Sequence, residues 1–377
     1  MASPVRHIVH LIYRLDTGGL ENVVVQLVNH LPQDEFRHTV VAITEADPDF
    51  AQRIKIQGVE VICLGKGPGQ PFWLYPKVAK LLRRLKPDVL HTCNLAALEF
   101  APVAALVKVP RRIHAEHGMD IGELNGKGSR YLALRRFLKY FVHEQIAVSE
   151  SLSEYLRNRV GVAQDRLHLI PNGVDTQQFR PRRVGDPIPL GYPFAHDQHW
   201  VIGTVGRQVD IKNPLLLVDA FILLVRSGES GTERLRLALV GDGPLAGALF
   251  TRLQEAGLKD RAWLPGVRSD VAQILRSFDC FVLPSLSEAT SCTLQEAMAS
   301  GLPIIATDVG GNADLLAHGT CGSLVPSGDV QALAAQIWQQ QQGGPNTPQA
   351  TAALAFVRKR YALPVVIERY RQLFLAR

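Results

Sequence analysis

The chain has 377 residues, of which 46% are hydrophobic and 20% charged. These proportions exclude a chain that is disordered throughout, and the length is sufficient for two domains. Residues 1–185 carry 25 Lys and Arg against 18 Asp and Glu, a net charge of +7, whereas residues 186–377 carry a net charge of −1. The basic half predicts an anionic partner, such as a membrane surface or a phosphorylated lipid.

No apolar run is long enough to span a bilayer. The N-terminal apolar stretch is short and runs directly into Arg14 and Asp16, unlike a signal peptide. The five cysteines are scattered and form no CxxC pair, which indicates neither a zinc site nor a disulfide framework. We therefore expect a reduced, cytoplasmic protein, and the missing signal peptide argues against a periplasmic sugar-binding protein.

Short β-branched runs alternate with helical patterns along the whole chain. In the first half we expect helices such as 20–31 and 76–85 between strands at 7–13, 38–44, 59–64, 88–92, 112–116, 145–148 and 167–170. The second half repeats the rhythm, with strands expected at 200–206, 235–241, 279–284 and 303–307. Nearly continuous apolar strands that alternate with helices predict an α/β fold, with parallel sheets covered by helices on both faces.

A proline-rich stretch without periodicity, residues 181–199, separates the two halves. We therefore expect an N-terminal domain at 1–185, a C-terminal domain at 186–355 and a helical tail at 356–377. Ligands of parallel α/β sheets bind beyond the carboxyl ends of the strands. In a two-domain protein the cleft between the domains is the expected site.

The strongest candidate site lies in residues 279–311. Here a strand is followed by a polar loop that carries Glu288 and by a short helix, from about Ser291, that carries Glu296. The start of this helix presents free backbone N–H groups, which favour an anion. The two carboxylates could then hold the hydroxyl groups of a sugar and of a ribose.

A structural interpretation of the same segment is equally open. Thr293 and Glu296 have the spacing of a capping box, in which the glutamate satisfies backbone N–H groups at the helix start. Glu288 would then be a solvated loop residue.

Two cations follow the first strand of the second half. Gly206, Arg207 and Lys212 lie just beyond it, where cations can neutralise a diphosphate. A solvated pair of loop residues is the alternative.

Gly18, Gly19 and Glu21 follow the first strand of the chain and open a helix. Paired glycines allow a backbone to approach a ligand closely, and a helix start favours phosphate. An ordinary tight turn explains the pattern equally well. Neither a GxGxxG fingerprint nor a GxxxxGK[ST] loop is present, which excludes a P-loop NTPase.

His114, Glu116 and His117 stand at the end of another expected strand. Residues three apart in a strand point to opposite faces, so joint metal ligation by the two histidines is disfavoured. A histidine that binds ligand by hydrogen bonds is the preferred interpretation, and a structural histidine is the alternative.

Two basic helical patterns, residues 76–86 and 127–142, lie in the first half. The second mixes cations such as Arg135 and Arg136 with aromatic residues, and such a helix can lie on an anionic bilayer. A core-packed helix with a solvated basic face is the alternative. The pattern matches no nucleic-acid-binding module, so no nucleic acid partner is expected.

In their order and spacing these motifs resemble the retaining glycosyltransferases of family 4 with the GT-B fold, the group 1 sugar transferases. Within that family the chain is similar to the sugar transferases of exopolysaccharide and protein-sorting gene clusters. The resemblance covers nearly the whole chain and is carried by GGLEN (18–22), HAEHG (114–118), AVSESL (147–152), PNGVD (171–175), GRQVDIKN (206–213), LVGDGP (239–244), LPGVRSDV (264–271), SEATSCTLQEAMASGLPIIATDVGG (287–311) and CGSLVPSGD (321–329).

The resemblance implies two Rossmann-like domains that face across a cleft, with a C-terminal helix that crosses back to the first. It implies transfer of a sugar, with retention, from a nucleotide-diphosphate sugar to a hydroxyl of a glycan or polyprenyl-linked acceptor, in exopolysaccharide or cell-envelope glycan synthesis. No metal or other cofactor is expected, because Arg207 and Lys212 would stabilise the leaving diphosphate. The protein could contact the inner face of the cytoplasmic membrane through 76–86 and 127–142.

The resemblance also implies roles for individual residues. Glu288 would bind the hydroxyl groups of the donor sugar, Glu296 would bind the ribose, and His117 would lie near the transferred sugar. The remaining donor-side residues would be Gly18, Gly19, Gly206, Ala289, Thr290, Ser291 and Cys292. The acceptor side would be lined by Glu21, Ser149 and Asn172.

The chain departs from the family at Ala289-Thr290-Ser291, where Gly-Phe-Gly or Gly-Phe-Pro is common. The missing glycine constrains the loop that would contact the sugar. Two alternatives are a sugar-nucleotide epimerase of the same architecture and a non-catalytic subunit that binds sugar nucleotides. An epimerase would need no acceptor, and a binding subunit would not turn over.

Overall fold

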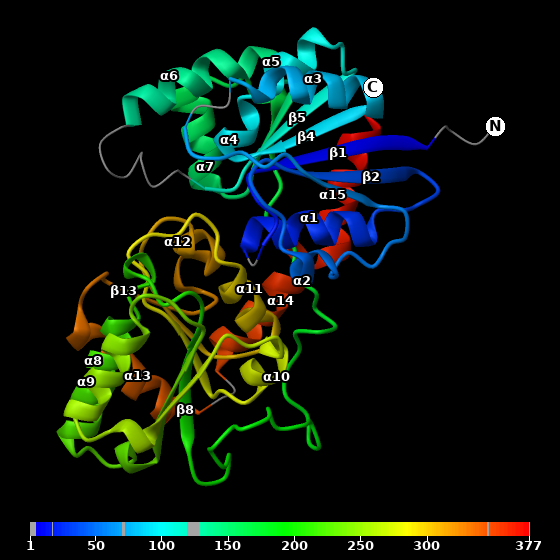
Figure 1. Cartoon of the computed structure of the whole chain (residues 1–377). Coiled ribbons are helices and arrows are strands. Elements are labelled where there is room, and N and C mark those ends of the chain that lie inside the picture. The colour runs from blue at the N-terminus through cyan, green and yellow to red at the C-terminus, as the bar shows by residue number, and fades with distance from the viewer. Residues whose placement is uncertain (1–4, 17, 70–71, 119–127, 345–346, 377) are drawn as a thin grey trace. The chain divides into compact units, whose positions relative to one another are not determined.

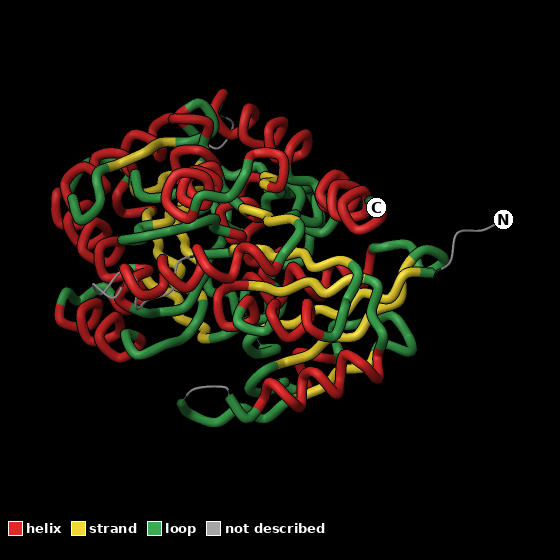
Figure 2. Tube along the Cα trace, turned by 90° about the horizontal axis from the view of Figure 1, so that it is seen from above, coloured by secondary structure: helices red, strands yellow, loops and turns green. Residues whose placement is uncertain are grey.

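Strands and helices alternate along the chain in a computed structural model that describes residues 5–16, 18–69, 72–118, 128–344 and 347–376 (Figures 1 and 2). The chain divides into two compact units. The first contains Met1–Gly173 and Pro364–Arg377, and the second contains Val174–Leu363. The sequence predicts a domain boundary at residue 185. In the structure, residues 174–185 belong to the second unit.

In the described part of the first unit, seven strands form one parallel sheet. In spatial order they are β3 (Glu60–Cys63), β2 (Phe36–Ala42), β1 (Arg6–Ile12), β4 (Val89–Cys93), β5 (Arg111–Glu116), β6 (Glu144–Ala147) and β7 (Leu167–Leu169). The central strands β1 and β4 are buried on both faces along almost their whole length. Such burial requires helices on both sides of the sheet.

Helices cover each face of this sheet (Figure 1). One face carries α3 (Leu74–Leu85), α4 (Asn94–Leu98), α5 (Ala101–Leu106) and α6 (Gly128–Leu138). The other carries α1 (Gly19–His30), α2 (Pro48–Ala51) and the final helix α15 (Leu363–Leu375), and α7 (Glu150–Tyr155) follows β6. In α3 the buried residues Leu74, Val78 and Leu82 are four apart and pack on the sheet, which leaves its Lys and Arg side chains exposed.

The second unit contains a parallel sheet of six strands among its described residues. In spatial order they are β10 (Ala262–Gly266), β9 (Leu235–Val240), β8 (Trp200–Val205), β11 (Cys280–Leu283), β12 (Ile304–Thr307) and β13 (Ser323–Val325). One face packs on α8 (Pro214–Ser227), α9 (Ala246–Glu255) and α13 (Val330–Gly343). The other packs on α10 (Val271–Arg276), α11 (Cys292–Ala299), α12 (Asn312–Leu315) and α14 (Pro348–Arg360).

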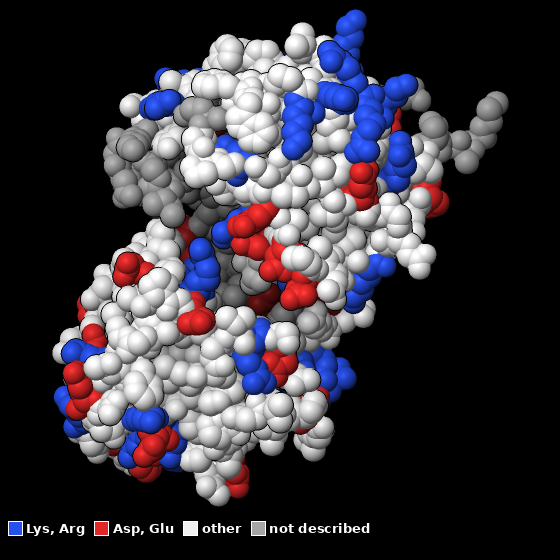
Figure 3. All heavy atoms as spheres, viewed as in Figure 1, with Lys and Arg blue, Asp and Glu red and all other residues white. Residues whose placement is uncertain are grey.

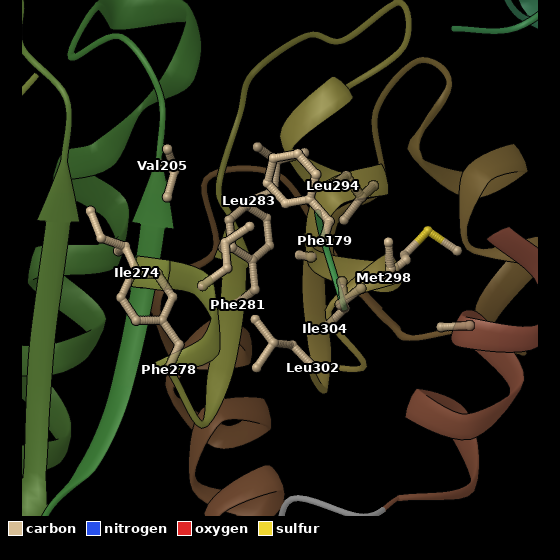
Figure 4. Packing of buried hydrophobic residues seen from close by; sticks show 14 of the residues in the cluster. Phe179, Val205, Ile274, Phe278, Phe281, Leu283, Leu294, Met298, Leu302 and Ile304 are labelled. Atoms are coloured by element: carbon tan, nitrogen blue, oxygen red, sulfur yellow. The ribbon is translucent and has the colours of Figure 1, made fainter. Parts of the chain in front are cut away.

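The core on the α11 side fixes the position of that helix. Figure 4 shows Leu294 and Met298 of α11 beside Phe281 and Ile304, which come from β11 and β12. All four side chains are at most 1% exposed. Because a packed interior resists displacement, the loop before α11 is held at a fixed place beyond the sheet.

In each sheet, the order in which the chain adds strands reverses once. In the first unit the chain moves outward from β1 to β3, then returns to the other side of β1 with β4; in the second unit β11 returns to the other side of β8 in the same way. The crevice beyond the carboxyl ends of the two strands at such a reversal is the usual ligand site of this architecture. The fold therefore points to the segments that follow β1 and β4, and to those that follow β8 and β11.

The expected strands all appear, with ends that differ by one or two residues. Two further strands, β10 and β13, were not predicted, and they lie at the two edges of the second sheet. β10 contains Pro265 and Gly266, which weaken a strand pattern, and β13 has only three residues. The two-domain α/β class with parallel sheets is confirmed.

Candidate functional site

In the second unit, the loops after β8 and β11 gather the expected donor-side residues. A pocket opens at the carboxyl ends of β8, β9 and β11, where Gly206, Arg207 and Lys212 are among the lining residues. Gly241 keeps this loop in place: a Cβ atom there would lie 2.0 Å from the carbonyl oxygen of Gly206, and its φ is +127°. Only glycine fits such a close approach.

The two cations of this loop differ in their surroundings. The side chain of Arg207 is exposed, and no hydrogen bond or ion pair joins its guanidinium to a residue of the described ranges. Lys212 donates from Nζ to Oε1 of Glu288 at 2.6 Å. The structure thus brings Lys212 and Glu288, which are 76 residues apart, into one charged pair and leaves Arg207 open to solvent.

Glu288 is held by its neighbours as well as by Lys212. Its side chain accepts a second hydrogen bond at Oε1, from Oγ of Ser285 at 2.6 Å, and the residue is only 8% exposed. Its carbonyl oxygen accepts from the N–H of Gly311 at 3.0 Å. A Cβ atom at Gly310, where φ is +51°, would lie 1.8 Å from that same carbonyl oxygen. A solvated loop position for Glu288 is therefore wrong.

The helix α11 begins at Cys292, close to the expected start. Its N-cap is Ser291, whose Oγ accepts from the N–H of Leu294 at 3.3 Å. The capping box expected from Thr293 is therefore wrong, because Thr293 already lies inside the helix. Glu296 lies in the second turn of α11 and is half-buried.

The loop residues Ala289 and Thr290 are half-buried and lead directly into this N-cap. Together with Cys292 they occupy the stretch between Glu288 and the first turn of α11. Backbone N–H groups at a helix start of this kind favour an anionic ligand.

In the first unit, the expected residues follow four strands of one parallel sheet. Gly18, Gly19 and Glu21 come after β1, and α1 begins at Gly19. His117, Ser149 and Asn172 come after β5, β6 and β7. Because all strands of this sheet are parallel, these residues lie along the same carboxyl edge.

His117 is the most unusual of them. Its ring is fully buried, and burial lowers the pKa of this histidine to about 4, although the charge of Glu116 and a hydrogen bond with Asn172 act in the opposite direction. Its main-chain N–H donates to Oδ1 of Asn94 at 2.8 Å. Asn94 begins α4 with a φ of +60°, a left-handed conformation that is uncommon outside glycine. His117 is therefore a neutral imidazole that can exchange hydrogen bonds with a hydroxyl group.

Metal ligation by the HAEHG segment finds no support. His114 bonds through Nδ1 to Thr92 at 3.0 Å and through Nε2 to Oε2 of Glu116 at 3.3 Å. Within the described ranges, no cluster of three or more His, Cys, Asp and Glu side chains is arranged to hold a metal ion.

One expectation for the basic helix 127–142 is wrong. Arg135, which the sequence analysis counted among the cations of a membrane-facing helix, is 1% exposed and pairs with both carboxylate oxygens of Glu116 at 3.0 and 3.1 Å. Its pairing with a buried carboxylate removes it from the surface. Arg136 is exposed, whereas Lys127 lies outside the described residues.

The sequence analysis also overlooked three residues at these edges. Ser285 and Gln208 belong to the two loops of the second unit, and Asn94 belongs to the first. Asn94 follows the expected strand 88–92 by two residues, which was a weak signal. Ser285 precedes Glu288 by only three residues, but the sequence does not show that its hydroxyl bonds to that carboxylate.

Comparison with known families covers most of both units. Residues 17–178 match the family described as Glycosyltransferase Family 4, and residues 199–340 match Glycosyl transferases group 1. These two ranges include the candidate residues of both sheets. Among the residues that the structure describes, no helix is long and apolar enough to cross a membrane.

Individual relatives align over most of their length. A UDP-Gal:alpha-D-GlcNAc-diphosphoundecaprenol alpha-1,3-galactosyltransferase of Escherichia coli is 27% identical over 84% of this chain and 83% of that protein. A GDP-mannose-dependent alpha-mannosyltransferase of Mycobacterium tuberculosis (strain CDC 1551 / Oshkosh) is 28% identical over 92% and 86%.

A solved structure, Anabaena Alr3699/HepE in complex with UDP, superposes with a TM-score of 0.80 at 20% identity over 97% of this chain and 99% of that one. The likeness confirms the GT-B fold. The chain therefore carries a Glycosyltransferase Family 4 domain in residues 17–178 and a Glycosyl transferases group 1 domain in residues 199–340.

Proposed function

We propose that the protein transfers a sugar, with retention of anomeric configuration, from a nucleotide-diphosphate sugar to a hydroxyl of a glycan or polyprenyl-linked acceptor. The observation that carries the proposal is the arrangement after β8 and β11. There the side chain of Arg207 is exposed and forms no ion pair with a described residue, whereas Lys212 pairs with Glu288.

This arrangement suits a diphosphate next to a sugar. Arg207 can pair with a phosphate oxygen as the protein stands, without first breaking an internal ion pair. Lys212 is paired with Glu288 beside the pocket, so its ammonium could contact a bound diphosphate and the carboxylate at the same time. Oε1 of Glu288 accepts from Lys212 and Ser285, which leaves Oε2 to accept from hydroxyl groups of the sugar.

The same residues supply the electrostatic part of catalysis. The bond between the anomeric carbon and the phosphate oxygen breaks while negative charge builds on the leaving diphosphate. Two fixed cations and the N-terminus of α11 stabilise that charge. We therefore propose that transfer needs no metal.

Retention follows if the acceptor attacks from the face that the diphosphate leaves. The acceptor oxygen forms the new bond to the anomeric carbon, and its proton passes to the departing phosphate oxygen. The bonds formed and broken balance, so the step needs no further reactant. In this proposal Glu296 binds the ribose and His117 holds a hydroxyl group by hydrogen bonds.

The relatives named above use UDP-galactose and GDP-mannose, so the base of the donor is left to experiment. Two glycosyltransferase family matches favour transfer over the epimerase and over the non-catalytic subunit. An acceptor linked to undecaprenol in the E. coli relative supports a lipid-linked acceptor and a role in exopolysaccharide or cell-envelope glycan synthesis.

A lipid-linked acceptor implies that transfer takes place at the inner face of the cytoplasmic membrane. One face of the first unit has side chains that favour contact with lipid. α3 lies beside α5, and α5 lies beside the turn Lys139–Phe141 that ends α6. Five large apolar side chains on these segments are more than half exposed: Phe72, Trp73, Leu106, Phe137 and Tyr140. Aromatic residues of this kind favour the lipid headgroup region.

Cations accompany these aromatic residues. Lys77, Lys80, Arg83 and Arg84 are exposed on α3, and Figure 3 shows Lys and Arg gathered over that part of the first unit. Basic side chains next to an anionic bilayer each contribute about 1 kcal/mol. We therefore propose that α3, α5 and α6 contact anionic lipid, without the buried Arg135.

Sedimentation with vesicles tests this contact. The protein should bind vesicles containing 30 mol% phosphatidylglycerol at low salt, and 0.5 M salt should release it. Lys80→Glu/Arg83→Glu should weaken binding strongly, whereas Arg226→Glu/Lys259→Glu in the second unit should not. Equal binding by both double variants would contradict the proposed face.

The transferase proposal is tested with the donor that binds best and a diphosphoundecaprenol-linked saccharide. In EDTA, NMR of the early product should show the anomeric configuration of the donor. The opposite configuration would refute retention, and dependence on added Mn²⁺ or Mg²⁺ would refute metal independence. Release of an isomerised sugar nucleotide without acceptor would identify an epimerase.

A further inference from the structure

Gln208 is a residue of the second-unit pocket to which the sequence analysis gave no role. It stands between Arg207 and Lys212 in the loop after β8, and all three line the pocket at the carboxyl ends of β8, β9 and β11. Arg207 is exposed and Lys212 is half-buried, whereas Gln208 is only 4% exposed. A polar side chain is thus buried at the base of a site that offers two cations.

The backbone of Gln208 is fixed from both sides. Its N–H donates to the carbonyl oxygen of Asp242 at 2.8 Å, and its own carbonyl accepts from the N–H of Leu245 at 3.0 Å. A Cβ atom at Gly243, where φ is +157°, would lie 2.4 Å from that carbonyl. The loops after β8 and β9 are therefore closely joined here, and Gln208 cannot move away from the pocket without breaking both hydrogen bonds.

The amide oxygen of the Gln208 side chain, by contrast, lacks a hydrogen-bond donor in the described part of the chain. Oε1 of Gln208 is buried, and no described residue donates a hydrogen bond to it. A buried acceptor without a donor destabilises the fold, and an apolar side chain of the same size would avoid that cost. A polar residue at such a place is useful if a ligand supplies the missing donor.

The chemistry of that ligand is restricted by the three side chains. Arg207 and Lys212 attract an anion, whereas an amide oxygen accepts only from an N–H or O–H group. An inorganic diphosphate satisfies the cations but offers no suitable donor when fully ionised. A nucleotide sugar offers both, since its diphosphate lies between hydroxyl groups and a base that carries N–H.

We propose that Gln208 is a specificity-determining residue that accepts a hydrogen bond from a hydroxyl or N–H group of the nucleotide-sugar donor. The inference rests on the proposed function and adds a contact to it. It predicts opposite effects on stability and binding. Removing the amide should raise the melting temperature of the ligand-free protein, because an unpaired acceptor is lost, and should weaken donor binding.

Calorimetric titration of the full chain in EDTA tests the proposal with three ligands: inorganic pyrophosphate, the nucleoside diphosphate and the matching nucleotide sugar. Gln208→Met keeps the length of the side chain without its hydrogen bonds, and Gln208→Leu is a second variant in case the first folds poorly. Gln254→Met, at an exposed position of α9, is the matched control.

We expect both Gln208 variants to bind the nucleotide sugar about tenfold more weakly, which corresponds to about 1.4 kcal/mol, with pyrophosphate affinity unchanged. A loss that already appears with the nucleoside diphosphate assigns the contact to the nucleoside. A loss confined to the nucleotide sugar assigns it to a sugar hydroxyl. The control should bind all three ligands like the wild type.

Unchanged affinity for both nucleotide ligands would overturn the inference while leaving the proposed function intact. An equal loss for pyrophosphate would overturn it as well, because the variant would then have disturbed the cation loop. A wild-type chain that binds no nucleotide would instead contradict the proposed function, and the inference with it.

Discussion

The two units share one architecture but bury polar groups in different ways. In the first unit, His10, His38 and His91 form a buried chain on the sheet: Nδ1 of His10 lies 3.0 Å from Nδ1 of His91, and its Nε2 lies 3.1 Å from Nδ1 of His38. Phe374 of α15 packs edge-on against His10 and His91. A second buried cluster joins Glu116 and Arg135.

The second unit keeps its histidines out of the core. His196 and His199 are half-buried and His318 is exposed, although polar side chains such as Asp279 and Gln295 are buried in this unit. The charged pair of its candidate site, Lys212 and Glu288, lies in the loops beyond the sheet. The second unit therefore buries none of its three histidines, whereas three histidines of the first unit are buried in one hydrogen-bonded chain.

The largest expected difference between the two units is their loss of stability in acid. Burial lowers the pKa of His38 to about 4 and of His91 to about 3, and it holds the pKa of His10 well below its ordinary value. Below pH 6.5 the unfolded chain binds protons that these folded histidines do not. The stabilisation is thus complete above pH 6.5 and is lost as the pH falls, by up to about 1.4 kcal/mol per pH unit for each histidine.

Hydrogen exchange of backbone amides between pH 7 and pH 5 measures this loss of stability separately for each unit. Amides of β1, β2 and β4 should lose protection before those of β8, β9 and β11. His38→Gln should reduce the pH dependence without abolishing it, because the pKa values of His10, His91 and His117 are lowered as well. Equal acid sensitivity of the two sheets would contradict the comparison.

Breaking the buried ion pair should have the next largest effect. Burial alone would raise the pKa of Glu116, but hydrogen bonds from His114 and the charge of Arg135 outweigh it and lower the pKa to about 2. Glu116→Gln leaves Arg135 buried without its counter-charge, which costs about 3–5 kcal/mol. Chemical denaturation should show this loss.

The matched control is Lys212→Met, which breaks the charged pair of the second unit. Because the ammonium is partly open to water and Glu288 keeps its hydrogen bond from Ser285, this variant should lose less than Glu116→Gln, about 1–3 kcal/mol. A larger loss for Lys212→Met than for Glu116→Gln would reverse the proposed difference between the units.

A smaller effect is expected at Gly310, where a Cβ atom would collide with the carbonyl of Glu288. Gly310→Ala should cost about 1–3 kcal/mol and should weaken donor binding, because the loop that carries Glu288 must shift. Gly328 also has a positive φ, +79°, but has open space around it. Gly328→Ala should therefore destabilise the fold by about 1 kcal/mol and leave donor affinity unchanged in calorimetry.

The smallest effect should follow from Ser285→Ala, which removes one of two hydrogen bonds to Oε1 of Glu288. We expect donor affinity to fall about three- to tenfold, since a hydrogen bond to a charged group contributes about 1.5–3 kcal/mol at most. Ser300→Ala removes a hydroxyl that bonds only to the carbonyl of Glu296 and should bind donor normally. Identical affinities for the two variants would show that Ser285 does not position Glu288.

Much of the fold could be predicted because its signal is local. Runs such as 38–44 and 235–241 are apolar and β-branched, and they became β2 and β9 with ends shifted by two residues or fewer. β13 could not be predicted, because three residues carry too little pattern. The capping of α11 was misassigned because Ser291 and Thr293 both have side chains suited to an N-cap, and in the structure Ser291 accepts from the N–H of Leu294.

The candidate site was predictable in its residue types and not in its contacts. The spacing of Glu288 and Glu296 was visible, but the pairing of Glu288 with Lys212 joins segments 76 residues apart. The burial of Arg135 was hidden for a similar reason: its partner Glu116 lies in a strand, and the helix around Arg135 reads as an exposed basic face. Such tertiary pairings leave no mark on local sequence.

The measurement that tests the central claim most directly is donor binding to the cations of the second unit. A thermal-shift panel of UDP, GDP, ADP, CMP and their sugars in EDTA should compare wild type with Arg207→Ala/Lys212→Ala. A ligand at about 100 times its Kd stabilises the folded chain by about 2.7 kcal/mol. We predict that one nucleotide diphosphate or its sugar stabilises the wild type and not the double variant. Equal stabilisation of both proteins would contradict the claim that Arg207 and Lys212 bind the diphosphate.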